Sequence, residues 1–131
     1  MSVHPMPTPS APPVAGPYSP AVRAGDWYVL AGQIGLGADG TLVPGGVEAE
    51  ARQVLANVAA VLGDLGCNWG DVAKVGIFLT DLGNFGAVNV LYGDAIGPHR
   101  PARSTVGVAA LPAGAAVEIE CWVHKHDEPV P

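Results

Sequence analysis

The chain has 131 residues, the length of one domain; 49% of them are hydrophobic and 14% charged. This composition excludes a wholly disordered polymer, which would be polar and highly charged. The net charge is −6, and six Lys and Arg residues are too few for a basic patch that grips nucleic acid or an anionic membrane surface. No apolar run has the length of a transmembrane helix, and no secretory signal is evident. Cys67 and Cys121 lack metal or redox spacing, which favours reduced thiols in the cytoplasm.

The N-terminal segment differs in composition from the rest of the chain. Residues 1–15 are rich in proline and show no hydrophobic periodicity, which predicts a flexible or polyproline-like arm. From Gly16 onward, apolar residues recur with the periods of strands and helices. We therefore expect one folded domain over residues 16–124 and a C-terminal tail over residues 125–131.

Five segments predict strands. Aromatic and aliphatic residues fill positions 27–34 between turn residues, and a short strand at 21–23 is expected to pair with them through the turn at Gly25 and Asp26. Residues 71–80, 103–108 and 116–123 predict three more strands. In the last of these, alternation places Val117, Ile119, Cys121 and Val123 on one face and Glu118, Glu120 and Trp122 on the other.

Two segments predict helices. Over residues 47–65 the apolar residues recur at spacings of three and four, which makes one continuous face, and Gly66 is a natural C-terminal stop. Glu50 is among the charged residues that lie off this apolar stripe. Residues 85–96 predict a second helix, which Gly97 and Pro98 end.

The order of elements is therefore β-β-α-β-α-β-β, which predicts an α+β fold: a mixed β-sheet with two helices packed on one face. The other face of the sheet is then left uncovered. An uncovered apolar sheet face is a reason to expect oligomerisation.

Four positions stand out as candidates for chemistry. Arg103 begins a predicted strand, where it can hold a carboxylate through two parallel hydrogen bonds or form a structural ion pair with one of the acids. Glu118 and Glu120 share a strand face, either as water-orienting or general-base carboxylates or as a solvated face. Tyr18, held between two prolines, can donate a hydrogen bond to a substrate or pack where the chain enters the fold.

Other patterns do not indicate a cofactor. His124 and His126 share a strand face and amount to half a metal site, but no third ligand is evident and the surrounding residues suggest a solvated tail. The chain has no nucleophile elbow and no phosphate-binding loop. Its glycines at 32, 35 and 37 do not open a helix in dinucleotide-binding order. We predict neither a metal nor an organic cofactor.

Eight short motifs follow one another along the chain. They start at Gly16 (GPYS), Ala31 (AGQI), Ala51 (ARQVLAN), Phe78 (FLTDL), Val88 (VNVLY), Pro101 (PARSTV), Ala110 (ALP) and Val117 (VEIE). In this order and spacing they resemble the RidA/YjgF family of reactive-intermediate deaminases, and the match runs from about Gly16 to Val123.

This resemblance implies a compact α+β fold similar to the chorismate-mutase-like fold, assembled as a homotrimer with sites in clefts between subunits. It also implies cofactor-independent hydrolysis of 2-aminoacrylate and related enamines or imines to 2-oxo acids and ammonia. By position, Arg103 matches the arginine that clamps the substrate carboxylate, Glu118 the acid that positions water, and Tyr18 a cleft tyrosine. The positions that match substrate-binding residues of the family are Gly32, Asn89, Thr105 and Ala31.

The sequence departs from the family pattern at Ala31, where many members carry serine. The missing hydroxyl removes one hydrogen bond, worth on the order of 1 kcal/mol, and leaves the substrate range open. A pathway-specific enzyme acting on a dedicated enamine or oxo acid is therefore one alternative. A non-catalytic, chaperone-like trimer that binds small carboxylates is another. RNA cleavage, also linked to the family, fits the negative charge least well.

Overall fold

The computed structural model of the chain describes residues 2–125. It contains the helices α1 (Gly46–Asp64) and α2 (Phe85–Ile96) and short 3-10 turns at Trp69–Asp71, Leu82–Asn84 and Pro112–Gly114 (η3). Its strands are β1 (Val3–Pro5), β2 (Ala21–Ala24), β3 (Trp27–Gln33), β4 (Val72–Leu79), β5 (Ala102–Gly107) and β6 (Val117–His124). The seven elements predicted after residue 20 are confirmed, and each end lies within one residue of its prediction.

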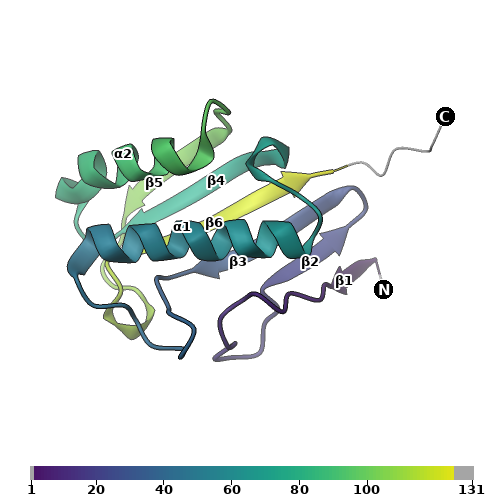
Figure 1. Ribbon diagram of the computed structural model, residues 1–131, viewed down its shortest axis with the longest axis horizontal. Coiled ribbons are helices and arrows are strands. Elements are labelled where there is room, and N and C mark those ends of the chain that lie inside the picture. Colours follow the sequence, from purple (N-terminus) through teal and green to yellow (C-terminus); the bar gives the residue numbers. More distant parts are fainter. Residues whose placement is uncertain (1, 126–131) are drawn as a thin grey trace.

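The strands form one mixed sheet in the order β1-β2-β3-β6-β4-β5 (Figure 1). The last strand, β6, is inserted between β3 and β4 and runs antiparallel to both. Strands β4 and β5 are parallel, because α2 carries the chain back across the sheet between them. The predicted α+β architecture, a mixed sheet with two helices, is confirmed.

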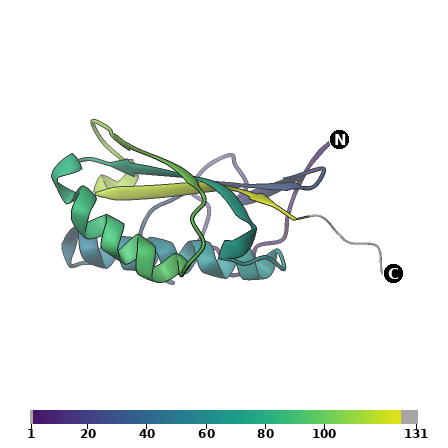
Figure 2. The ribbon, with the colours of Figure 1, turned by 90° about the horizontal axis from the view of Figure 1, so that it is seen from above.

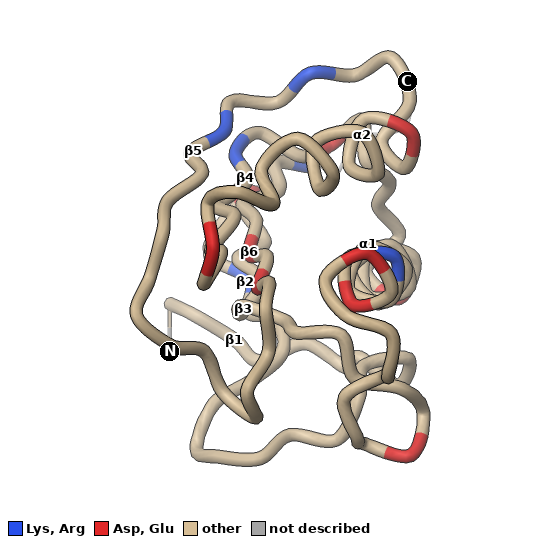
Figure 3. Tube along the Cα trace, turned by 90° about the vertical axis from the view of Figure 1, so that its left-hand side faces the viewer, with Lys and Arg blue, Asp and Glu red and all other residues tan. Residues whose placement is uncertain are grey.

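Both helices cover the same face of the sheet (Figure 2), and the end-on view of Figure 3 shows them together on one side of the strands. The core lies between these two layers. It includes Leu30 from β3, Val54 and Val58 from α1, and the four alternating residues of β6 that were predicted to share one face. Within residues 2–125, no helix is long and apolar enough to cross a membrane.

No helix of the described residues covers the opposite face of the sheet, which is partly apolar. Val29 pairs with Trp122 across β3 and β6, and Phe78 pairs with Val106 across β4 and β5. Val29, Phe78 and Trp122 are only partly buried, and Val106 is 44% exposed. The predicted uncovered face is therefore present in the single chain.

Helix α1 ends at the glycine that the sequence indicated. Gly66 has φ +71°, a left-handed backbone conformation that residues with a Cβ atom rarely adopt. The amide of Gly66 donates to the Gly63 carbonyl at 3.0 Å, and the amide of Cys67 donates to the Leu62 carbonyl at 2.8 Å. These two bonds satisfy carbonyls that the end of the helix would otherwise leave unpaired.

Glu50 differs from its prediction as a charged residue off the apolar stripe of α1. Its side chain is only 5% exposed, and its carboxylate accepts a hydrogen bond from the amide of Ala116 at 2.8 Å. The backbone of Glu50 also lies directly against Gly35, where an added Cβ would come within 2.8 Å of the Glu50 carbonyl oxygen. Glu50 therefore ties α1 to the start of β6, a contact that helical periodicity alone does not indicate.

The N-terminal arm, predicted as flexible or polyproline-like, contains a short strand. Residues Val3–Pro5 form β1, an edge strand paired with β2, where proline is tolerated because its missing donor faces outward. Ser10 then donates hydrogen bonds from its amide and its hydroxyl to the Asp64 carboxylate, both at 2.8 Å. The arm is therefore held by backbone pairing with β2 and by the Asp64 carboxylate at the end of α1. Neither contact produces a periodic pattern in the sequence.

Candidate functional site

A cleft of about 290 Å³, here called the β3–β6 cleft, opens where the end of β3 meets the start of β6. The N-terminal arm forms one wall and η3 another. Four of the predicted site residues lie here: Tyr18, Ala31, Gly32 and Glu118. The other lining residues are Ala11, Pro12, Pro13, Val14, Ala15, Pro20, Gln33, Ile34, Leu36, Gly40, Pro112 and Ala113. Among the described residues that line the cleft, Glu118 is the only carboxylate, and most of the others are apolar.

The carboxylate of Glu118 lies against the backbone of Gly32. A Cβ built on Gly32 would come within 2.7 Å of Glu118 Oε2, closer than real contacts allow. Gly32 therefore makes room for the carboxylate at this point. Burial raises the pKa of Glu118, and the nearby Glu120 carboxylate raises it further. A carboxyl group with a raised pKa in a cleft is a candidate general acid or base.

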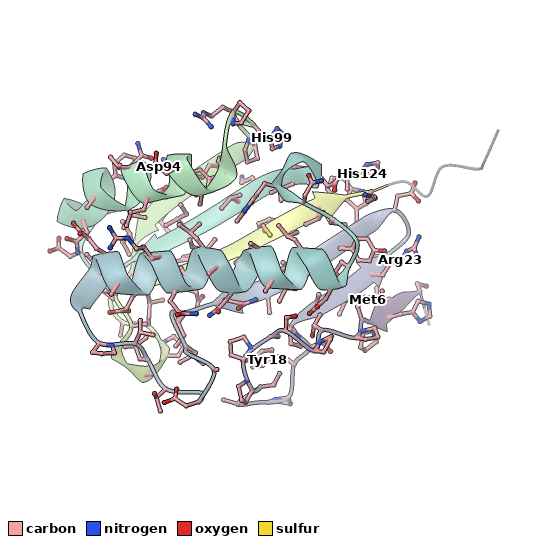
Figure 4. The ribbon with its side chains drawn as sticks, in the orientation of Figure 1. Met6, Tyr18, Arg23, Asp94, His99 and His124 are labelled. Atoms are coloured by element: carbon pink, nitrogen blue, oxygen red, sulfur yellow. The ribbon has the colours of Figure 1, made fainter. Side chains whose placement is uncertain are left out.

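Tyr18 and Ala31 complete the mouth of this cleft. Tyr18 is 54% exposed, so the single chain does not bury it as a packing residue. Figure 4 shows it at the lower edge of the molecule, beside the N-terminal segment. Ala31 is the last residue before the Gly32 backbone that approaches Glu118, and it contributes only a methyl group there.

A second cleft, here called the α2–β5 cleft, has a volume of about 350 Å³ and contains two further predicted residues, Asn89 and Arg103. Its other lining residues are Tyr92, Gly93, Ile96, Arg100 and Pro101. It shares no lining residue with the β3–β6 cleft. Asp94, labelled in Figure 4, marks α2 at the edge of the molecule opposite Tyr18.

Arg103 has donors available in this cleft. Its guanidinium carbon lies 4.9 Å from the ring centre of Tyr92 and 5.5 Å from that of Phe85. Within residues 2–125, no carboxylate pairs with Arg103, so the alternative of a structural ion pair with a described acid is wrong. A partly exposed guanidinium with unpaired N–H groups is suited to bind a carboxylate ligand.

The two clefts belong to opposite faces of the sheet. Arg103 is in register with Val75 of β4, whose side chain is buried under the helices, and it contacts α2. Glu118 is in register with Phe78, three residues further along β4. Because side chains alternate along a strand, Val75 and Phe78 point to opposite faces. Arg103 and Glu118 of one chain therefore cannot contact the same small ligand.

Thr105, the remaining predicted residue, follows Arg103 by two positions on β5 and faces the helices with it. It lines neither cleft. Its hydroxyl oxygen is buried and has no hydrogen-bond partner among the described residues. The structure therefore places Thr105 beneath the helix layer.

The histidine pair predicted as half a metal site is described only in part. His124 packs edge-on against Trp27, with ring centres 5.0 Å apart, while His126 lies outside the described residues. Within residues 2–125, no three potential ligands among His, Cys, Asp and Glu gather at one place. Cys67 and Cys121 are buried thiols, and burial raises the pKa of Cys121 to about 12.

Sequence reasoning missed several residues of the two clefts. The wall formed by Pro12, Pro13 and Val14 had no local signal, because it depends on the arm folding back beside β3. Tyr92, which lines the α2–β5 cleft, and Phe85, which contacts Arg103 without lining that cleft, are seven residues apart and share a helix face with Asn89. This spacing indicates a common face of the helix but does not indicate that Arg103 lies against it.

Comparison with known proteins identifies the family. The profile of the Endoribonuclease L-PSP family matches residues 8–125. The chain belongs to this family. The 2-iminobutanoate/2-iminopropanoate deaminase of Mus musculus is 44% identical over 114 residues, which cover 86% of this chain and 84% of the mouse protein. The resemblance to the RidA/YjgF family is thereby confirmed.

Solved structures agree with this assignment. A yeast protein superposes with a TM-score of 0.90 at 37% identity, covering 95% of this chain and 99% of the yeast chain. The E. coli protein TdcF, solved with bound serine, superposes with a TM-score of 0.86 at 34% identity, covering 93% of this chain and 98% of TdcF. The fold shared by this family is thus present along nearly the whole chain.

Proposed function

We propose that this protein hydrolyses reactive enamines and imines of 2-amino acids, such as 2-aminoacrylate, to 2-oxo acids and ammonia. The observation that carries the proposal is the Glu118 carboxylate, held against Gly32 in a cleft whose other walls are mostly apolar. The names of the deaminase relatives support the reaction class. That TdcF binds serine supports an amino acid-like ligand.

The chemistry needs few groups. The enamine tautomerises to an imine, whose C=N carbon is electrophilic. Glu118 accepts a proton from water as the water oxygen bonds to this carbon, and the proton passes to the nitrogen. The resulting carbinolamine collapses to a C=O bond and releases ammonia. Because the imine is already reactive, holding it beside an oriented water supplies much of the rate acceleration.

Arg103 binds the substrate carboxylate in this proposal, with Asn89 beside it. Tyr18, Ala31 and Gly32 contact the substrate from the β3–β6 cleft. Thr105, two residues after Arg103 on β5, is the remaining substrate-binding residue of the proposal. Since Arg103 and Glu118 lie on opposite faces of one sheet, we infer that two copies of the chain assemble each site. A homotrimer with sites between subunits accomplishes this, and the uncovered sheet face with Phe78 and Val106 supports such an assembly.

Buried thiols at Cys67 and Cys121 are compatible with the reducing cytoplasm expected from the sequence. RNA cleavage, which the name of the family profile mentions, has less support. The chain has six Lys and Arg residues, and Figure 3 shows positions of both charge signs interspersed. A phosphate backbone calls for a continuous basic surface.

The test is release of pyruvate and ammonia from 2-aminoacrylate generated in situ. Wild type is compared with Arg103→Ala, and circular dichroism checks that the variant is folded. We expect the wild type to accelerate release above the spontaneous rate and the variant to lose most of that acceleration. A wild type that does not exceed the spontaneous rate overturns the proposal. Carboxylate-dependent thermal stabilisation without turnover would then identify a protein that only binds.

A further inference from the structure

Helix α2 presents two aromatic rings to Arg103. Phe85 and Tyr92 are seven residues apart, so they lie on the same helix face about 10 Å apart along the axis. The Arg103 guanidinium carbon is 5.5 Å from the Phe85 ring centre and 4.9 Å from the Tyr92 ring centre. Both distances are within the roughly 6 Å range of a cation–π contact. The cation therefore occupies a cradle formed by two turns of one helix.

The rings fix the guanidinium without using its hydrogen-bond donors. A cation attracted by aromatic faces keeps its N–H groups unpaired, and within residues 2–125 no carboxylate takes them. An ion pair in the same place would satisfy the donors and compete with a ligand. Asn89 lies on the same helix face between the two rings and lines the same cleft as Arg103. The arrangement leaves the donors of Arg103 free to meet an anion in the α2–β5 cleft.

The two rings differ in how they are held. Tyr92 is 5% exposed, and its buried hydroxyl has no hydrogen-bond partner among the described residues. Phe85 is 43% exposed at the first turn of α2. Tyr92 is thus a fixed wall, while Phe85 is an outer wall that the core does not require. This difference makes Phe85 the position at which the cradle can be altered without unfolding the chain.

We propose that Phe85 and Tyr92 are positioning residues, which hold Arg103 with its donors directed at the substrate carboxylate. This inference rests on the proposed function, in which Arg103 binds that carboxylate. The rings themselves do not contact the reacting carbon. Losing one ring weakens carboxylate binding more than it slows hydrolysis of bound substrate. The aromatic face is what matters, so any aromatic residue at position 85 serves.

The decisive variant is Phe85→Leu, with Phe85→Tyr as the conservative replacement. The matched control is Val90→Ala, because Val90 is a 64% exposed apolar residue of the same helix outside both clefts. We expect Phe85→Leu to raise KM for 2-aminoacrylate by about threefold to tenfold with kcat little changed. Phe85→Tyr retains a KM near that of the wild type, and so does Val90→Ala. Equal KM values for Phe85→Leu and wild type overturn the proposal.

A second readout does not depend on turnover. The Nε–H resonance of Arg103, assigned by its loss in Arg103→Lys, is expected to be displaced by the currents of the two rings. Phe85→Leu should shift this resonance. It should also raise the Kd for pyruvate, measured by titration, by a factor similar to the change in KM. Tyr92→Phe keeps the ring and should leave both unchanged. If the wild type binds pyruvate but does not hydrolyse 2-aminoacrylate, the proposed function fails while the cradle stands. An Arg103 resonance insensitive to Phe85→Leu overturns the cradle alone.

Discussion

Arg103 and Glu118 lie on opposite faces of one sheet, although both are expected to act on one substrate. The register of β5 and β6 on β4 fixes this relationship, because Arg103 aligns with the buried Val75 and Glu118 with Phe78 on the uncovered face. A substrate a few ångströms long cannot contact both within one chain. Because Arg103 and Glu118 are separated in this way, co-expressing variants of the two residues can test whether two chains form one site.

We predict that two inactive variants restore each other's activity. Arg103→Ala and Glu118→Gln are each expected to be inactive, but co-expressed in equal amounts they should recover about a quarter of the wild-type activity, because one subunit interface in four then joins two intact residues. The measurement is ammonia release by the co-purified mixture. Separately purified variants, combined without subunit exchange, serve as the control. A co-expressed mixture as inactive as its parts places both residues within one chain and contradicts the intersubunit site.

Substituting Gly32 should disable the Glu118 carboxylate without unfolding the protein. The added methyl group of Gly32→Ala would come within 2.7 Å of Glu118 Oε2, so the carboxylate must move. We expect kcat/KM to fall by about tenfold or more, because misplacing a catalytic group is costly. The control is Gly63→Ala in α1, where the added Cβ meets nothing within 4 Å. Retained activity in Gly32→Ala would show that the position of this carboxylate is unimportant.

The pH dependence should reveal the environment of Glu118. Burial, and then the neighbouring Glu120, raise the pKa of Glu118. Since the ionised form accepts the proton from water, kcat/KM should decline on the acid side at a pH above the ordinary glutamate pKa of about 4.3. In Glu120→Gln one negative neighbour is lost, so the pKa falls and the decline moves to lower pH. Glu48→Gln, on the exposed side of α1, is the control.

The same pKa shift has a defined sign for stability. A carboxyl group whose pKa is higher in the folded state favours folding fully below its unfolded pKa, and that contribution is lost as the pH rises through the raised value. Ionised Glu118 therefore costs stability at neutral pH. Thermal unfolding of Glu118→Gln should give a Tm at neutral pH that is no lower than the wild type's. The raised pKa of Glu118 would be contradicted if Glu120→Gln leaves the low-pH decline of kcat/KM where it is in the wild type and Glu118→Gln has a lower Tm than the wild type.

Glu50 should contribute to stability and not to turnover. Its buried carboxylate accepts the amide of Ala116, and removing the acceptor leaves that donor unpaired. We expect Glu50→Ala to lower the free energy of unfolding by about 1–3 kcal/mol. Glu50→Gln, which keeps an oxygen acceptor, should lose less. Denaturant unfolding at fixed protein concentration measures both, and identical losses for the two variants would show that the hydrogen bond is not the cause.

Most of the fold could be predicted because local patterns and tertiary packing agree. The α1 stripe, the stop at Gly66 and the alternation of β6 all follow from spacing alone, and the structure places them accordingly. The arm and Glu50 could not be predicted in this way. Their partners lie far off in sequence, Asp64 for Ser10 and Ala116 for Glu50. Such contacts depend on how the elements dock.

The candidate site shows the same limit more sharply. Motif resemblance selected Tyr18, Gly32 and Glu118, which the structure brings into one cleft. It also selected Arg103, which the structure places in another. Periodicity does not indicate that Phe85 and Tyr92 contact the guanidinium of Arg103, because helical spacing shows only which helix residues share a face. Their contact with Arg103 depends on β5, the strand that pairs with β4 in parallel and carries this residue.

The alanine at position 31 provides the last test. Ala31 lines the β3–β6 cleft next to Gly32, where many family members are expected to carry serine. A hydroxyl group there adds one hydrogen bond, worth about 1 kcal/mol, which corresponds to about fivefold in kcat/KM. We expect Ala31→Ser to increase kcat/KM for 2-aminoacrylate by that factor, with Ala31→Val as a control that adds volume without a hydroxyl. If serine instead lowers the rate while a larger, apolar enamine is hydrolysed well by the wild type, the cleft is adapted to that dedicated substrate.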